Sequence, residues 1–450
     1  MDPERCIYKV SKSIRKVKPE AYRPQVVLIG LLNRCRKQKV AKDGAGTSSD
    51  PKRTNETKPK YVKMEKQKKK YLQSFKERVK PEDIEAMKKT IKDEENHIRE
   101  SYYESTDWVS PESFVDHILK DSVFIMEFII THGPNSVHDN PKQTADVKQD
   151  LMLLENQLPY FIIEKLFGSH METLGLKETV EEFILNFFSL KIKKQTNFRH
   201  FTDMFRYRES IKRTKSKTKS QVFLNDLTGE VIQGMANADN LSRAGVTFKT
   251  PNQLLQQMTS VSIGKETDDF SLHVAFEEGV LVMSSFHADE ASETILRNVI
   301  GFEQSHAAVV PFTSNYINFI NFLITNGRDV EVLTAEGVIR NHMGNPNRVV
   351  RMVNDLNLGL KKPKSSQYHS IAMNLIAHYK SRRNRCWATL KKVYFPDLLT
   401  GTATFAAMFL LFLTLVGTVA SVIQAWKSFE SVPPTIIYMT SKADQRNDAP

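Results

Sequence analysis

The feature that most constrains this chain is an uncharged apolar run close to its C-terminus. Residues 398–423 are 26 consecutive positions without a formal charge, rich in Leu, Phe, Val and Ala. As an α-helix this run would be roughly 39 Å long, which exceeds the ~30 Å hydrocarbon core of a bilayer. Buried helices of soluble proteins rarely run this far without a charge. The run therefore predicts one transmembrane helix, with Trp426 as an interfacial anchor.

The charges on the two sides of this run predict its orientation. The flank before it carries six basic and no acidic residues, namely Lys380, Arg382, Arg383, Arg385, Lys391 and Lys392. After it, three basic residues are matched by three acidic ones. Basic flanks tend to stay on the cytosolic side of a membrane. We therefore predict a single-pass membrane protein with a cytosolic body, at the plasma membrane or an endomembrane.

The net charge of +12 is concentrated in particular segments. Residues 1–80 hold 24 Lys/Arg against 8 Asp/Glu, so the rest of the chain is net negative. A second basic stretch, residues 191–219, has 11 basic and two acidic residues. Such segments favour contact with anionic surfaces. The three cysteines are too scattered for a disulfide framework or a zinc site, and we expect no cofactor and no metal.

The order of polar and apolar segments predicts a mainly α-helical fold with a small β element. We expect an extended N-terminal segment over residues 1–35, where Pro19 and Pro24 interrupt a helix. The chain then divides into segments of different composition: a basic polar loop at 36–60, a mainly helical body at 61–392 with a basic loop at 208–222, the transmembrane helix at 398–423 and a short tail at 424–450.

Local patterns place individual elements inside the body. Ser110 followed by Pro111 is typical of a helix start, and apolar residues continue at helical spacing to Phe128. Between residues 245 and 286, apolar residues recur at every second position on both sides of Glu277-Glu278-Gly279. That pattern predicts a small β-hairpin.

One segment carries a resemblance to a known family. DLMLLENQLPYFIIEKLF at 150–167 resembles the hallmark of the plant family catalogued as domain of unknown function 247. Further segments resemble the same family in the same order, at 7–30 (IYKVSKSIRKVKPEAYRPQVVLIG), 71–75 (YLQSF), 121–129 (DSVFIMEFI), 241–249 (LSRAGVTFK), 297–306 (RNVIGFEQSH) and 329–339 (DVEVLTAEGVI). With the C-terminal apolar run, the resemblance extends over nearly the whole chain.

The resemblance implies a plant membrane-associated protein whose biochemistry is largely undefined. Some members of that family are similar to pollen-side determinants of grass self-incompatibility. The chain departs from the family pattern after Gly30, where Leu31-Leu32-Asn33 stands in place of the usual Gly-Pro and histidines. Any role that needs the usual N-terminal surface is therefore not implied for this chain.

Two polar clusters in these motifs are the candidate sites. Glu155-Asn156-Gln157 precedes a proline, where backbone groups without helical partners need side-chain partners. Glu303 and Gln304 are interpreted as a buried pair that bridges helices. We therefore assign structural roles, and no catalytic role, to the residues Leu151, Leu154, Glu155, Asn156, Gln157, Leu158, Pro159, Phe302, Glu303 and Gln304. Of these, Leu151, Leu154 and Leu158 predict one face of a helix that Pro159 ends.

These observations favour a membrane-anchored, non-catalytic interaction protein that acts in plant recognition or signalling through an unknown protein partner. The basic segments would add contact with anionic lipid. An enzyme with an unrecognised site near Glu155 and Glu303 is one alternative. Binding of nucleic acid is the other, because aromatic residues are interleaved with the basic ones, namely Phe198, Phe201, Phe205 and Tyr207. No hydrolase, zinc-peptidase or dinucleotide-binding pattern occurs in the sequence.

Overall fold

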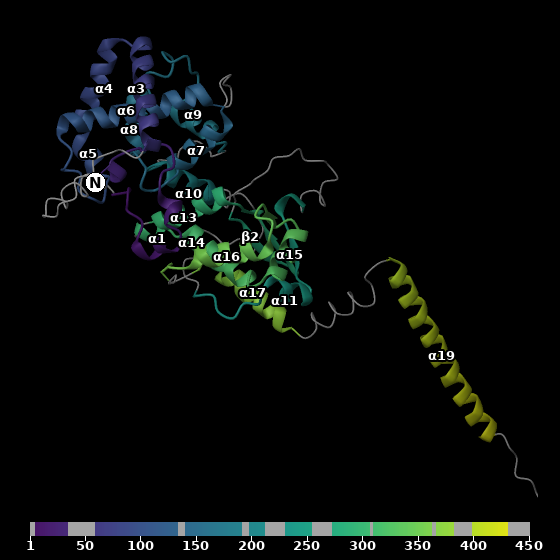
Figure 1. The fold of residues 1–450 in the computed structure, drawn as a ribbon. Helices are drawn as coiled ribbons and strands as arrows, with labels where there is room; N and C mark the ends of the chain where they lie inside the picture. Colours follow the sequence, from purple (N-terminus) through teal and green to yellow (C-terminus); the bar gives the residue numbers. More distant parts are fainter. Residues whose placement is uncertain are drawn as a thin grey trace, which may run out of the picture. The chain divides into compact units, whose positions relative to one another are not determined.

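The computed structural model describes residues 5–34, 59–133, 140–190, 198–211, 230–253, 272–306, 309–361, 366–381 and 398–430. The chain divides into two units, Met1–Arg382 and Arg383–Pro450. The first unit is mainly α-helical with two small sheets, which confirms the predicted fold class (Figure 1).

Within the described residues, the first half of the body consists of helices and non-regular segments. Its elements are α1 (Lys12–Val17), the 3₁₀ helix η1 (Pro19–Tyr22), α3 (Pro59–Arg78), α4 (Pro81–Asp93), α5 (Glu95–Glu100), α6 (Pro111–His132), α7 (Pro141–Leu151), α8 (Tyr160–Phe167), α9 (Val180–Phe187) and α10 (Phe201–Ile211). Helix α6 packs against α3 and α4 (Figure 1). It begins as predicted, because the Ser110 side chain accepts a hydrogen bond from the Ser113 backbone N–H.

The second half of the body combines short strands with helices. Its elements are α11 (Ala238–Arg243), β1 (Thr247–Lys249), β2 (Val274–Glu277), β3 (Val280–Met283), β4 (Phe286–Ala288), α13 (Glu290–Ser305), α14 (Phe312–Leu323), α15 (Gly327–Ala335), β5 (Ile339–Asn341), α16 (Pro346–Asn357) and α17 (His369–Lys380). Strands β2 and β3 form the predicted hairpin, with positive φ at Glu278 and Gly279 in its turn. Strand β1 adds parallel to β3, and β4 pairs in parallel with β5. The sequence analysis missed β4 and β5 because three residues are too few to show a period.

Helix α13 lies between the hydrophobic cores of the two halves. Its Val299 belongs to the core of the first half, whereas Leu296 and Ile300 belong to the core of the second. Phe302 joins a third, smaller cluster that includes Val10 and other residues of the N-terminal segment. Four positions within two turns of one helix therefore hold together parts of the chain that are far apart in sequence.

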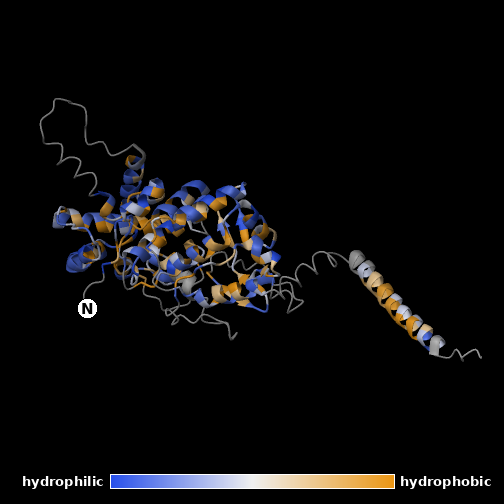
Figure 2. Ribbon diagram, turned by 90° about the horizontal axis from the view of Figure 1, so that it is seen from below, coloured by the Kyte–Doolittle hydropathy of each residue, from blue (hydrophilic) through white to orange (hydrophobic). Residues whose placement is uncertain are grey.

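The second unit contains one long exposed helix, α19 (Leu398–Glu430). Residues Thr404–Ser428 are long and apolar enough to cross a membrane, and none of the tested window is buried against the protein. Figure 2 shows apolar residues along most of its length. The prediction that a tail starts at 424 is wrong for its first seven residues, because the helix continues to Glu430. Of the six predicted flanking basic residues, Lys380 ends α17 and the other five lie outside the described residues.

The structure corrects the predicted helix of the hallmark segment. Helix α7 ends at Leu151, and residues 152–159 are not helical. The Gln157 side-chain amide donates to the backbone carbonyls of Leu151 and Leu153, at 2.6 and 2.8 Å. Such side-chain bonds compete with the backbone N–H groups that a continuing helix would use. The three motif leucines are nevertheless fully buried.

Other predicted boundaries also change. The N-terminal segment is not wholly extended, because α1 and η1 form on the two sides of Lys18, with Pro19 at the first position of η1. The predicted basic loop at 208–222 begins too early, since α10 runs through Ile211. Its remainder, like most of the predicted loop at 36–60, lies outside the described residues, and α3 already begins at Pro59.

Candidate functional site

The motif residues meet around a non-helical stretch of the N-terminal segment, residues 25–31, which we call the threaded segment. It is buried from Val27 onward and belongs to no strand or helix. Buried backbone N–H and C=O groups need hydrogen-bond partners, and a non-regular segment must find them in side chains or water. The hallmark segment and α6 supply those side chains.

The Asp150 carboxylate holds the start of the threaded segment. Its two oxygens accept hydrogen bonds from the consecutive backbone N–H groups of Gln25, Val26 and Val27, at 2.7, 2.7 and 2.8 Å. Asp150 is fully buried at the end of α7. Hydrogen bonds from backbone N–H groups to a charged acceptor are stronger than neutral ones. Asp150 therefore fixes this entry into the core.

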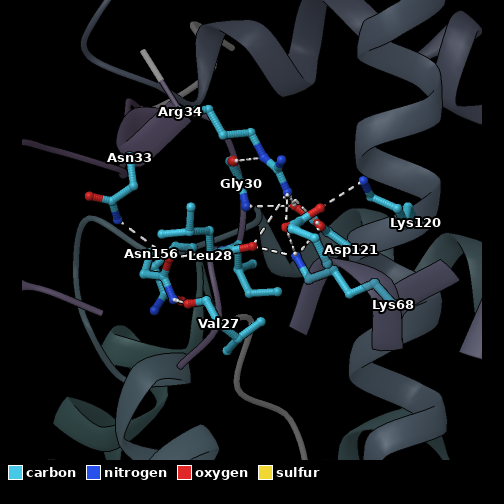
Figure 3. A network of polar contacts seen from close by, with 12 residues as sticks. Val27, Leu28, Gly30, Asn33, Arg34, Lys68, Lys120, Asp121 and Asn156 are labelled. Carbon is cyan, nitrogen blue, oxygen red and sulfur yellow. Dashed lines mark hydrogen bonds and ion pairs between the residues drawn. The ribbon is translucent and has the colours of Figure 1, made fainter. Parts of the chain in front are cut away.

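Asn156 continues the same pattern further along the threaded segment. Its Oδ1 accepts from the Ile29 N–H at 2.8 Å, and its Nδ2 donates to the Val27 carbonyl at 3.1 Å (Figure 3). Nδ2 also donates to the backbone carbonyl of Asp150 at 2.9 Å. One buried side-chain amide thus replaces the bonds that a neighbouring strand would make.

The other two polar residues of the hallmark cluster hold different backbone groups. Glu155 Oε1 accepts from the Val10 N–H at 2.9 Å and from the Arg15 guanidinium. Gln157 Oε1 accepts from the Phe201 N–H at 3.0 Å, which fixes the start of α10. Pro159, the last residue of the motif, directly precedes α8. Each polar side chain of the cluster therefore serves the backbone of another segment.

Helices α3 and α6 complete the site with a buried ion-pair cluster. Asp121 Oδ2 accepts from the Gly30 N–H at 3.0 Å, and Asp121 Oδ1 lies 2.6 Å from Lys68 Nζ (Figure 3). Lys68, which is fully buried, also donates to the Leu28 carbonyl. The Arg34 guanidinium lies 3.1 Å from Asp121 and donates to the Gly30 carbonyl.

Sequence reasoning missed this cluster, although one signal was present. Lys68 stands in the apolar row of α3 formed by Met64, Tyr71 and Phe75, at helical spacing. A lysine within such a row needs a buried partner, since an unpaired buried charge is strongly unfavourable. The sequence did not identify that partner, Asp121, which lies 53 positions away.

The cluster keeps its carboxylates ionised. Burial opposes ionisation of Asp121, but the charges of Lys68 and Arg34 outweigh it and lower the pKa of this carboxyl. At Glu65, burial is likewise outweighed by the neighbouring cations, Lys68 first, which lower its pKa to about 2. A carboxylate in this state does not accept protons near neutral pH, which argues against general acid or base chemistry at these two groups.

The second predicted motif holds a different element. Glu303 accepts from the backbone N–H groups of Thr313 and Ser314, each at 2.8 Å, and so caps the start of α14 from outside. Burial raises the pKa of Glu303, and these hydrogen bonds partly oppose the rise. Gln304 accepts from the Lys361 N–H at 3.2 Å, and it is half-buried, so the prediction of a buried pair is wrong for this residue. Glu155 binds the N-terminal segment and Glu303 binds α14, so the two carboxylates serve different elements.

Phe302 packs against a buried histidine. The centroid of the His200 ring lies 4.7 Å from that of the Phe302 ring, in an edge-to-face arrangement. The Asp203 backbone N–H donates to His200 Nδ1, so Nε2 carries the hydrogen and donates to the Cys6 carbonyl at 2.9 Å. Burial lowers the pKa of His200 to about 4, although Asp203 and the Cys6 hydrogen bond oppose this shift.

Because the pKa of His200 is lowered by folding, we expect the free energy of unfolding to decrease in acid. The unfolded state takes up a proton near pH 6.5 but the folded state only near pH 4, so stability falls as the pH falls through this window. We expect the unfolding free energy to drop by about 3 kcal/mol from His200 alone. Chemical denaturation at pH 7, 5.5 and 4 would measure it.

His200→Gln is the matched control, since it keeps a donor for the Cys6 carbonyl and removes the titration. Its stability should change less between pH 7 and 4 than that of the wild type. The remaining slope includes His117, whose pKa burial also lowers, and Glu303, which acts in the opposite direction because its pKa is raised. Equal slopes for both proteins would contradict the assignment to His200.

Three of the four aromatic residues of the second basic stretch are part of the core, and the side chain of the fourth, Tyr207, lies outside the described part of the chain. Phe198, Phe201 and Phe205 are buried, and Phe188 packs against the last two. Buried rings cannot stack on exposed nucleic-acid bases. Among the residues that the structure describes, no group of three or more His, Cys, Asp or Glu side chains is arranged to hold a metal ion.

Comparisons with known proteins agree with the resemblance seen in the motifs. Residues 7–413 match a family described as plant proteins of unknown function, DUF247. A UPF0481 protein from Arabidopsis thaliana is 23% identical over 439 residues, which cover 93% of this chain and 86% of that relative. No solved structure matches the chain. The chain therefore belongs to the DUF247 family of plant proteins.

Proposed function

We propose that this chain is a membrane-tethered, non-catalytic interaction protein. The observation that carries the proposal is α19, whose apolar residues Thr404–Ser428 are unburied over a length that can cross a bilayer. An apolar surface of this size is unfavourable in water and favourable in lipid. The six basic residues between 380 and 392 support a cytosolic body.

The hallmark cluster supports an interaction role over a catalytic one. Asp150, Glu155, Asn156 and Gln157 are buried and bonded to backbone groups of other segments. A general acid or base must reach a proton of its substrate, which a side chain enclosed in this way does not do. The rigid body would instead present its outer surface to a protein partner, in plant recognition or signalling.

Alkaline extraction tests the tether. Full-length protein should stay with membranes after carbonate washing, because α19 is held by apolar burial that high pH does not remove. A chain ending at residue 394 should be extracted. Release of the full-length protein by carbonate would contradict the proposal.

On intact vesicles, added protease should digest the body, whereas a protected body would reverse the proposed topology.

Glu155→Gln tests the non-catalytic role. The substitution keeps an oxygen for the Val10 N–H and removes the charge that faces Arg15. We expect a loss of about 1–3 kcal/mol of stability and an unchanged set of partners in proximity labelling. Glu155→Ala is the comparison that also removes the Val10 bond. A Glu155→Gln protein that keeps its fold and partners but loses its biological output would favour the enzyme instead.

A further inference from the structure

One exposed face of α3 carries a dense group of lysines, which we call the lysine face. Its members are exposed side chains on the outer side of the helix, namely Lys63, Lys66, Lys69, Lys70 and Lys76. Lys63, Lys66 and Lys70 recur at spacings of three and four residues, which places them in one row along the helix. From first to last the face extends roughly 20 Å along the helix.

The packing of α3 forces these lysines outward. Met64, Lys68, Tyr71 and Phe75 point into the core, and the Lys68 ammonium is fixed between Asp121 and the Leu28 carbonyl. These anchors, spread over three turns, set the rotation of the helix about its axis. The lysine face is therefore a fixed feature of the surface.

The lysine face is also not neutralised by the protein. Among the described residues, none of its five lysines forms an ion pair, whereas neighbouring basic groups do: Lys120 pairs with Glu65 and Arg78 with Glu127. Glu77, the acidic residue exposed beside it, accepts a hydrogen bond from Gln73. A row of uncompensated ammonium groups attracts a polyanion.

We propose that the lysine face of α3 binds the anionic surface of a lipid membrane. Lysine is a flexible point charge, which suits mobile lipid phosphates and carboxylates better than a fixed planar ligand. Of the aromatic residues of the same helix, Tyr71 and Phe75 are buried, and the hydroxyl of the half-buried Tyr61 donates to the Pro24 carbonyl. None of them belongs to the lysine face, which therefore offers no aromatic stacking platform for nucleic-acid bases. This inference rests on the proposed membrane tether, which would keep the body near lipid.

Amine labelling of the full-length chain in vesicles tests the proposal. The protein is reconstituted in phosphatidylcholine vesicles with or without about 30% phosphatidylserine, and lysines are labelled from outside and located by mass spectrometry. We expect the five lysines to be labelled on the order of tenfold more slowly with phosphatidylserine. Exposed Lys142 and Lys177 should not change. Salt at about 0.5 M should abolish the protection.

Charge reversal provides the matched variants. Lys66→Glu, Lys69→Glu and Lys70→Glu together should remove the protection of Lys63 and Lys76. Reversal of Lys142, Lys177 and Lys361, three exposed lysines elsewhere, should preserve it. Carbonate resistance of each variant reports insertion separately, so a failed tether is distinguished from a failed lysine face.

If the chain proves not to insert, flotation with the same vesicles becomes the measurement. Salt-sensitive binding that falls on the order of a hundredfold in the Lys66, Lys69 and Lys70 variant would still support the lysine face. Equal labelling in both lipids overturns the proposal. So does binding of an oligonucleotide, rather than the vesicles, that depends on these lysines.

Discussion

Gly30→Ala is expected to prevent accumulation of the folded body. Gly30 has φ +65°, where an alanine costs about 1–2 kcal/mol. An added Cβ would also overlap the Gln157 carbonyl oxygen and lie 2.8 Å from the Tyr102 hydroxyl. The overlap involves backbone held on both sides, so relief requires movement of the threaded segment itself, at about 1–3 kcal/mol or more. Together these costs are a large part of the ~5–15 kcal/mol stability of a typical domain.

Gly234→Ala is the control for the cost of placing an alanine at positive φ. Gly234 has a nearly equal φ of +69°, but an added Cβ would meet nothing within 4 Å. Gly234→Ala should therefore lower the free energy of unfolding only by this backbone conformational cost, without any steric overlap. Thermal unfolding of both variants, followed by near-UV circular dichroism, gives the difference. Equal destabilisation by the two substitutions would show that the close approach of Gly30 to Gln157 is unimportant.

Asp121→Asn is expected to cost about 3–5 kcal/mol, since it removes the nearest counter-ion of a buried ammonium and leaves only the longer contact with Glu65, at 3.4 Å. The Lys68 side chain is fully buried, and Asp121 lies 2.6 Å from its ammonium. Asparagine has the same shape, so the effect measures the lost charge together with one lost acceptor oxygen, and not a cavity. Chemical denaturation at pH 7 would measure the loss as a lower midpoint with an unchanged slope.

Two further variants separate the ion pair from general charge effects. Lys68→Met in the Asp121→Asn chain removes the ammonium that has lost its nearest counter-ion, and it should restore much of the stability. Glu85→Gln breaks an exposed ion pair with Lys88, 2.7 Å apart, and should cost less than about 1 kcal/mol. If Asp121→Asn were as mild as Glu85→Gln, the cluster would not be the anchor of the threaded segment.

The sequence by itself determined the features that depend on close neighbours. The long apolar run predicted α19, and Ser110-Pro111 predicted the start of α6. The alternation around Gly279 predicted the β2–β3 hairpin. In each case the residues that decide the structure lie within a few positions of one another, so a local pattern contains the information.

Only the tertiary structure decided what the hallmark segment does. Its helical spacing of leucines predicted a helix, yet residues 152–159 form a loop. The partners that decide this are distant: Asn156 binds Ile29 across 127 positions, and Glu155 binds Val10 across 145. Spacing within a segment does not reveal which remote backbone groups lack partners once the chain is compact. The need of the buried threaded segment for hydrogen bonds outweighs the local preference for helix.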